Sequence, residues 1–101
     1  MENEITITRE DFDITEISLK INGKTFKASV TQEAITELNK NHGIDAVGEI
    51  VRQLYYEYAG NSDQTIIENK YSQTFKATRH RHDSETVSIS FERGEDNETS
   101  N

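Results

Sequence analysis

The sequence predicts an α+β domain in which two β-hairpins form one antiparallel sheet, with a short and a longer amphipathic helix packed on one face. Three observations support this class. Residues 47–58 repeat apolar side chains at helical spacing, whereas residues 14–30 and 74–91 alternate apolar and polar side chains as strands do. The predicted element order is β-β-α-α-β-β, which is typical of a sheet covered on one side by helices.

The longer helix is expected to supply much of the core. Its apolar stripe consists of Val47, Ile50, Val51, Leu54, Tyr55 and Tyr58, and its other side carries Glu49, Arg52, Gln53 and Glu57. Asp45 precedes this helix and is a suitable N-cap. We therefore expect the stripe to pack on the sheet and the polar side to face solvent.

The first hairpin is predicted from agreement between its turn and its pattern. Asn22-Gly23 is the dipeptide best suited to a type I′ turn, because both central residues need positive φ. A two-residue loop places Leu19 opposite Phe26 and Ile17 opposite Ala28 on one face. Thr31 then follows as an N-cap for a short helix over residues 32–41.

The second hairpin is predicted from residues 74–78 and 87–91, which alternate in the same way. The proposed register sets Phe75 opposite Phe91 and closes the loop at residues 82–84. It also places Arg81 opposite Glu85 as a salt bridge at the neck. A register that slides by two residues remains an alternative.

The two ends of the chain are more polar than residues 14–93, which form the predicted domain. Residues 1–13 form an acidic arm, in which 5–8 is either a short strand or part of a mobile segment, and residues 94–101 are expected to be a disordered acidic tail. No apolar run approaches the roughly 18 residues of a membrane span. The acidic N-terminus, unlike a secretion signal, and the absence of cysteine predict a protein of the bacterial cytoplasm.

The formal charge of -8 disfavours general binding to nucleic acid and suits a partner protein with a basic surface. Excess negative charge also simply keeps a small protein soluble. The candidate contact residues in the acidic arm are Glu10, Asp11, Phe12 and Asp13, with Phe12 either an anchor in a partner or packed over the sheet edge. Tyr56 lies opposite the apolar stripe and is either a surface residue or a binding aromatic.

One basic segment interrupts the acidic chain. Arg79, His80, Arg81 and His82 follow Lys76 on the same predicted strand. Three interpretations remain open: a β-ribbon that contacts nucleic acid through Lys76, Arg79 and Arg81, a metal site at the two histidines, or a solvated hairpin tip. Because no third ligand of suitable type is indicated, we predict no metal and no cofactor.

No motif for catalysis is present, and we expect no enzyme: glycine-rich phosphate loops, nucleophile elbows and His-Glu-x-x-His helices are absent. The composition, acidic and free of Cys and Trp, is typical of short accessory proteins of phages and mobile elements. The leading hypothesis is a small acidic non-catalytic protein-binding module, such as a phage inhibitor of a basic nucleic-acid-handling host protein. The alternatives are the nucleic-acid-binding β-ribbon and a structural accessory subunit that homodimerises by sheet-edge pairing.

Overall fold

The computed structural model describes residues 3–11 and 13–94, and of residues 10 and 11 it describes the backbone alone. The N-terminal strands are β1 (Asn3–Asp11), β2 (Ile14–Ile21) and β3 (Lys24–Thr31). The helical segments are α1 (Gln32–Thr36), the π-helical turn η1 (Glu37–Asn41) and α2 (Ala46–Ala59). The C-terminal strands are β4 (Gln64–Glu68), β5 (Thr74–Arg81) and β6 (Val87–Arg93).

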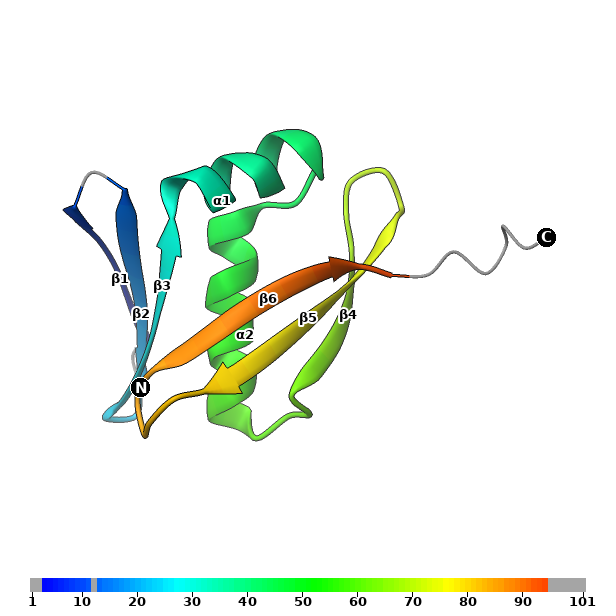
Figure 1. Cartoon of the computed structure of the whole chain (residues 1–101). Helices are drawn as coiled ribbons and strands as arrows, with labels where there is room; N and C mark the ends of the chain where they lie inside the picture. The colour runs from blue at the N-terminus through cyan, green and yellow to red at the C-terminus, as the bar shows by residue number, and fades with distance from the viewer. Residues whose placement is uncertain (1–2, 12, 95–101) are drawn as a thin grey trace.

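Two three-stranded antiparallel sheets lie on opposite sides of α2 (Figure 1). The first sheet has the order β1-β2-β3 and the second has the order β4-β5-β6. The α+β class and both hairpins are confirmed. The arrangement differs from the single sheet that the sequence predicts, because β1 and β4 each add a strand and the two hairpins meet only at one parallel bridge between Lys27 and Thr86.

The first sheet follows the predicted register. Asn22 and Gly23 both have positive φ, 52° and 81°, as a type I′ turn requires. Leu19 lies opposite Phe26 and Ile17 lies opposite Ala28, as predicted. Residues 3–11 of the acidic arm form β1 and pair with β2, which agrees with the strand alternative.

The second hairpin is shifted by two residues from the first of the two registers considered. Ala77, Arg79 and Arg81 lie opposite Phe91, Ile89 and Val87. The loop sets this register: the Asp83 carboxylate accepts hydrogen bonds from the backbone N–H groups of Glu85 and Thr86. The prediction of an Arg81–Glu85 salt bridge was therefore wrong. Glu85 pairs with Lys27, and Arg81 pairs with Glu57 on α2.

Both helices begin at the predicted caps. The Thr31 hydroxyl accepts from the N–H of Ala34 at 3.0 Å, and the Asp45 carboxylate accepts from the N–H of Gly48 at 3.2 Å. Gly60 ends α2 in the left-handed conformation with φ 77°. These caps fix the ends of α2 and hence the position of its side chains between the sheets.

The core has two parts. One lies between the first sheet and α2 and contains Ile17, Leu19, Ile21, Ala28, Ile50, Leu54 and Val87. The other lies under the short helical segment and contains Ile35, Leu38, Ile44, Ala46, Ile67 and Phe75. The first part includes Ile50 and Leu54 of α2, and the second includes Ala46 at the start of the same helix.

The predicted orientation of α2 is correct on one side and wrong on the other. Ile50 and Leu54 are buried as expected, whereas Tyr55 is 47% exposed. Glu49 and Gln53 were expected in solvent and are buried. The reason is the second sheet, which covers the polar side of the helix.

Candidate functional site: a groove between two strand edges

A groove opens where the edge of one sheet faces the edge of the other. β3 and β6 are joined at one end, where the N–H of Lys27 donates to the carbonyl of Glu85 at 2.8 Å. An ion pair of 3.8 Å between the same two side chains closes this clasp. From the clasp the two strands diverge, and α1 lies across the open end (Figure 1).

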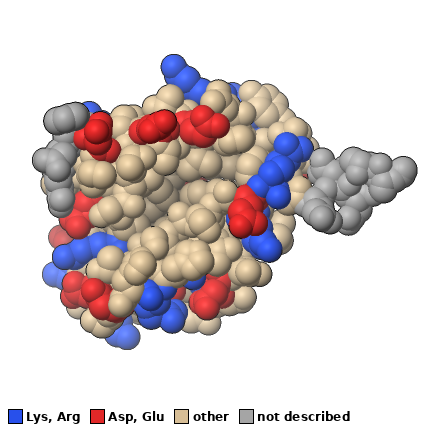
Figure 2. Space-filling view, viewed as in Figure 1, with Lys and Arg blue, Asp and Glu red and all other residues tan. Residues whose placement is uncertain are grey.

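The groove has a volume of about 310 Å³ and a mostly apolar lining. The apolar residues that line it are Ala28, Val30, Ala34, Leu38, Ile50, Phe75, Ile89 and Phe91. Figure 2 shows uncharged surface across this region, with the charged side chains toward its margins. A hollow of this kind favours an apolar ligand over a charged one.

The backbone on both walls is available for pairing. The backbone N–H of Lys27 points away from β2. Because every second residue of an antiparallel strand points its backbone groups in the same direction, those of Ser29 point into the groove. On the facing wall, Gly94 donates its N–H to Thr74 of β5. By the same alternation Ile89 and Phe91 direct their backbone groups away from β5 and toward the groove.

The polar residues of the lining gather at the wide end. Glu37 and His42 approach to 3.3 Å, an ion pair when the histidine is protonated. The His42 ring meets the ring of Phe75 edge-on at 5.4 Å, and the Arg93 guanidinium lies 5.8 Å from the centre of the same ring. Phe75 is thus flanked by two nitrogen-bearing side chains at this end of the floor.

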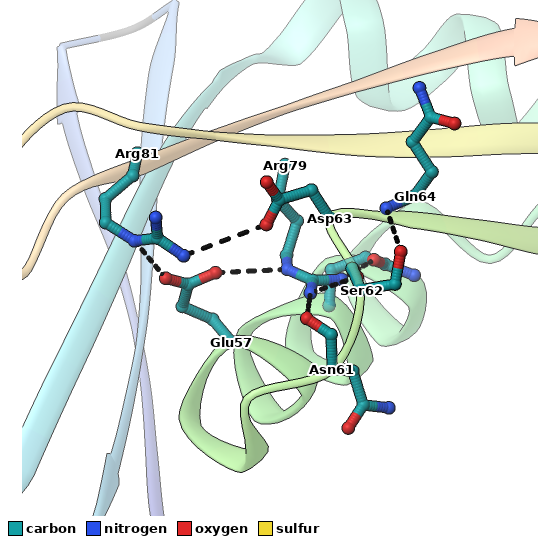
Figure 3. A network of polar contacts seen from close by, with 8 residues as sticks. Glu57, Asn61, Ser62, Asp63, Gln64, Arg79 and Arg81 are labelled. Atoms are coloured by element: carbon teal, nitrogen blue, oxygen red, sulfur yellow. Dashed lines mark hydrogen bonds and ion pairs between the residues drawn. The ribbon is translucent and has the colours of Figure 1, made fainter.

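A second polar cluster lies on the other side of α2, between that helix and β5 (Figure 3). The buried Arg79 side chain donates to Glu57 at 3.2 Å and to Gln53 at 3.0 Å. It also donates to the backbone carbonyls of Asn61 and Ser62, in the loop that follows the helix. Arg79 therefore ties the end of α2 to the second sheet.

Glu57 also accepts a hydrogen bond from Arg81, which lies 3.8 Å from Asp63. Burial alone would raise the pKa of Glu57, but the hydrogen bonds and charges of Arg81 and Arg79 together lower it. The hydrogen bond to Glu57 in turn raises the pKa of Arg81. A carboxylate kept ionised in this way is suited to structure and not to donating a proton.

The model of the family described as major capsid protein Gp23 matches residues 2–97 of this chain. The chain belongs to this family. It is accordingly a phage-related structural protein.

No curated protein and no solved structure matches the chain. Within residues 3–11 and 13–94, no helix is both long and apolar enough to span a membrane. The phage origin that the composition suggested is thus supported by the family.

The described residues among the predicted contacts lie in different surroundings. Arg79 was expected on an exposed ribbon, and this was wrong, because its guanidinium is buried against α2. Arg81 is half exposed but bound to Glu57. Tyr56 is half-buried and its ring lies 6.3 Å from that of Tyr55.

His80 and His82 lie on the outer face of the second sheet. They contact the hydroxyl groups of Ser90 and Ser88 on the neighbouring strand. Among the described residues, no group of three or more His, Cys, Asp or Glu side chains could hold a metal ion. The Asp83 carboxylate, next to His82 in the sequence, accepts hydrogen bonds within its own loop.

The acidic arm is described only in part. Asp13 is exposed in the turn between β1 and β2. Phe12 lies outside the described residues, and so do the side chains of Glu10 and Asp11. The expected tail, residues 94–101, lies outside them as well, apart from Gly94.

Sequence reasoning missed the groove altogether. Val30, Ile89 and Phe91 are alternating apolar residues, and their pattern indicates strands but not which strand edge is left open. The only local signal is that each hairpin ends in an unpaired edge. Which edges face each other depends on how both sheets pack on α2.

Proposed function

We propose that this phage structural chain is a non-catalytic protein-binding subunit that holds an extended segment of a neighbouring protein in the groove between β3 and β6. The observation that carries the proposal is the geometry of the two walls. Backbone groups point across an apolar floor from both walls: from Ser29 on β3, and from Ile89 and Phe91 on β6. Such a site suits a peptide backbone that adds to a sheet edge.

The expected ligand is an extended segment with apolar side chains at alternate positions. In an added strand, every second side chain points to the same face, so residues i and i+2 would enter the groove together. The floor at Leu38, Ile50 and Phe75 offers apolar contacts to both. Main-chain hydrogen bonds would supply affinity, and these two side chains would supply specificity.

Charge adds a preference for basic flanks on that segment. Glu33 and Glu37 lie on the short helical segment at the open end, and acidic side chains line the upper margin in Figure 2. The net charge of -8 acts in the same direction. The proposed partner is therefore a basic one, as the composition suggests, and its proposed contact is the groove.

The geometry opposes the nucleic-acid interpretation of the second hairpin. Of its three cations, Arg79 is buried and Arg81 is bound to Glu57, while Lys76 lies opposite Glu92. No continuous basic surface remains on that strand for phosphate groups. Inhibition of a basic host protein would use the same groove, and the family favours a partner within the phage.

The test uses two proline substitutions on β3. Ser29→Pro removes a backbone N–H that points into the groove. Thr25→Pro is the control: it removes an N–H that also points away from β2 but lies beyond the clasp, outside the groove. Neither N–H is used in pairing with β2, so both variants should fold. Binding is measured on overlapping peptides that cover the phage's other structural proteins and, as a separate set, basic nucleic-acid-handling host proteins.

The expected result is that wild type and Thr25→Pro bind peptides with alternating apolar residues, and that Ser29→Pro binds them about tenfold more weakly or less. Binding to peptides of the phage's structural proteins supports a partner within the phage. Binding to host peptides would instead indicate that the protein is an inhibitor of a host protein. If Ser29→Pro binds as wild type does, the groove is not the site.

A further inference from the structure

The free edge of β1 combines an exposed apolar surface with exposed backbone. Ile5 and Ile7 lie opposite Leu19 and Ile17 on the helix-facing side of the first sheet. Each is 54% exposed, whereas Leu19 and Ile17 are 3% and 0% exposed. The cause is the position of α2, which packs on β2 and β3, so that β1 extends past it (Figure 1).

The backbone groups of the same two residues point away from the sheet. Because the N–H of Lys27 is directed away from β2, its partner Ser18 directs its own backbone groups toward β1. Ser18 therefore pairs with Thr6 by hydrogen bonds, and Ile5 and Ile7 direct theirs to the outer edge. A nine-residue edge of this kind is a ready template for a further strand.

We propose that β1 pairs with β1 of a second copy of this chain, antiparallel and about a two-fold axis at Thr6. The contact joins the two first sheets into one six-stranded sheet. Ile5 of each copy then lies opposite Ile7 of the other, and both belong to pairs that exchange backbone hydrogen bonds. An isologous contact of this type is the commonest way in which identical chains associate.

The register follows from the side chains of β1. With the axis at Thr6, every exposed isoleucine meets an isoleucine, and Glu4 meets Thr8. A shift of two residues one way places Ile7 against Asn3, and the other way places Ile5 against Arg9 and Glu4 against Glu10. Of these registers, only the one centred on Thr6 sets both isoleucines against apolar partners, and over residues 3–9 it opposes no like charges.

Charge gives this contact a signature of its own. Each copy carries a net charge of -8, so two copies repel each other and salt should strengthen their association by screening. A basic partner held by attraction would respond to salt in the opposite direction. The contact is also separate from the groove, since β1 lies on the far side of β2 from β3.

The register is tested with single cysteines, because the chain has none of its own. At the axis, Thr6 would face its own copy in a non-hydrogen-bonded pair, with Cα atoms about 4.5 Å apart. This is within the range of about 4.4–6.8 Å that a disulfide spans. Thr6→Cys should therefore form a linked dimer on mild oxidation, and Thr8→Cys, on the same face of the same strand, should not. Linking of both variants to the same extent, or of neither, would overturn the proposal.

The surface is tested by light scattering over a concentration series at low and at high salt. Wild type should dimerise more strongly at high salt, and Ile5→Lys with Ile7→Lys should weaken the dimer by about tenfold or more. Ile66→Lys, at an isoleucine exposed on the second sheet, is the control and should dimerise as wild type does. A wild-type chain that is monomeric at every concentration and salt would overturn the contact. Ser29→Pro should leave the dimer intact, which separates this result from that of the groove.

Discussion

The two sheets pack on the same helix by different chemistry. The first sheet meets α2 through apolar side chains, with Ile17 and Leu19 against Leu54. β5 of the second sheet meets the opposite side of α2 through hydrogen bonds, with Arg79 bound to Gln53 and Glu57, while Val87 of β6 joins the apolar cluster. Both sides are buried, so the polar side of this helix is an interior surface.

The difference bears on what each contact requires. An apolar contact tolerates small shifts, because its energy depends on area and packing. A buried ion pair and its hydrogen bonds require every partner to be present. We therefore expect the second sheet to fix the angle at which the groove opens, because it cannot slide along α2 without breaking the Arg79 bonds.

Arg79→Met should have the largest effect on stability. It leaves Glu57 with only one of its two cations and Gln53 with one bond fewer in the interior, at a cost of about 3–5 kcal/mol in the free energy of unfolding. Urea denaturation measures this directly. Arg52→Met should cost less than Arg79→Met, because Arg52 is itself exposed and lies 3.9 Å from its partner Glu49.

Adding Glu57→Leu to Arg79→Met sharpens the result. When both partners of a buried pair become apolar, no charge is left uncompensated, so the double variant should lose less than the sum of the two single losses. Additive losses would show that the network does not act as a unit. The two sheets would then differ in the side chains that contact α2 but not in how strongly those contacts depend on one another.

Leu54→Ala tests the apolar side and should cost about 2–5 kcal/mol, because Leu54 is completely buried between α2 and the first sheet. Tyr55→Ala is its matched comparison. The sequence pattern assigns both residues to one buried stripe, but Tyr55 is half exposed and should cost about 1 kcal/mol. Equal losses in thermal or urea unfolding would restore the predicted stripe and contradict the observed rotation of the helix.

Gly23→Ala should have a smaller effect of about 1 kcal/mol. Its φ is 81° and an added Cβ would meet no atom within 4 Å, so the cost comes from the backbone conformation alone. Gly60→Ala has a similar φ and equally open space, and should cost a similar amount. A much larger loss for Gly23→Ala would mean that the substitution also disturbs the pairing of β2 and β3 beyond the turn itself.

The same turn explains what could be predicted from sequence. Asn22-Gly23 determines the register of β2 and β3 locally, so that register was correct. The loop after β5 depends on which backbone groups the Asp83 carboxylate meets, and pattern alone does not show this. The predicted register of β5 and β6 was accordingly two residues off.

The burial of Arg79 and the groove are both consequences of tertiary packing. Arg79 alternates with Phe75 and Ala77, so it shares their face of the strand, which is the inner face in the structure. What the pattern lacks is the partner: Glu57 and Gln53 face Arg79 only because a second sheet covers that side of α2. The groove likewise exists only because two sheet edges diverge around one helix.

The smallest expected effect is on how the free energy of unfolding changes with pH. It again distinguishes the polar side of α2 from the apolar side. Interactions with Arg81 and Arg79 lower the pKa of Glu57 in the folded protein, although burial acts against them. A carboxylate whose pKa is lower when folded stabilises the fold above its ordinary pKa, and this contribution is lost as pH falls through the folded value. Wild type should therefore lose stability more steeply than Glu57→Gln between about pH 6 and pH 3.

The measurement is urea unfolding at several pH values, with Leu54→Ala as the comparison. Leu54→Ala removes no titrating group, so its stability should fall with pH in parallel with wild type. Glu57→Gln should start lower, because Arg79 and Arg81 lose an ionised partner, and then fall more gently. If Glu57→Gln and wild type also ran parallel, the Glu57 carboxylate would contribute nothing by its charge, and the second sheet would rest on α2 by packing, as the first sheet does.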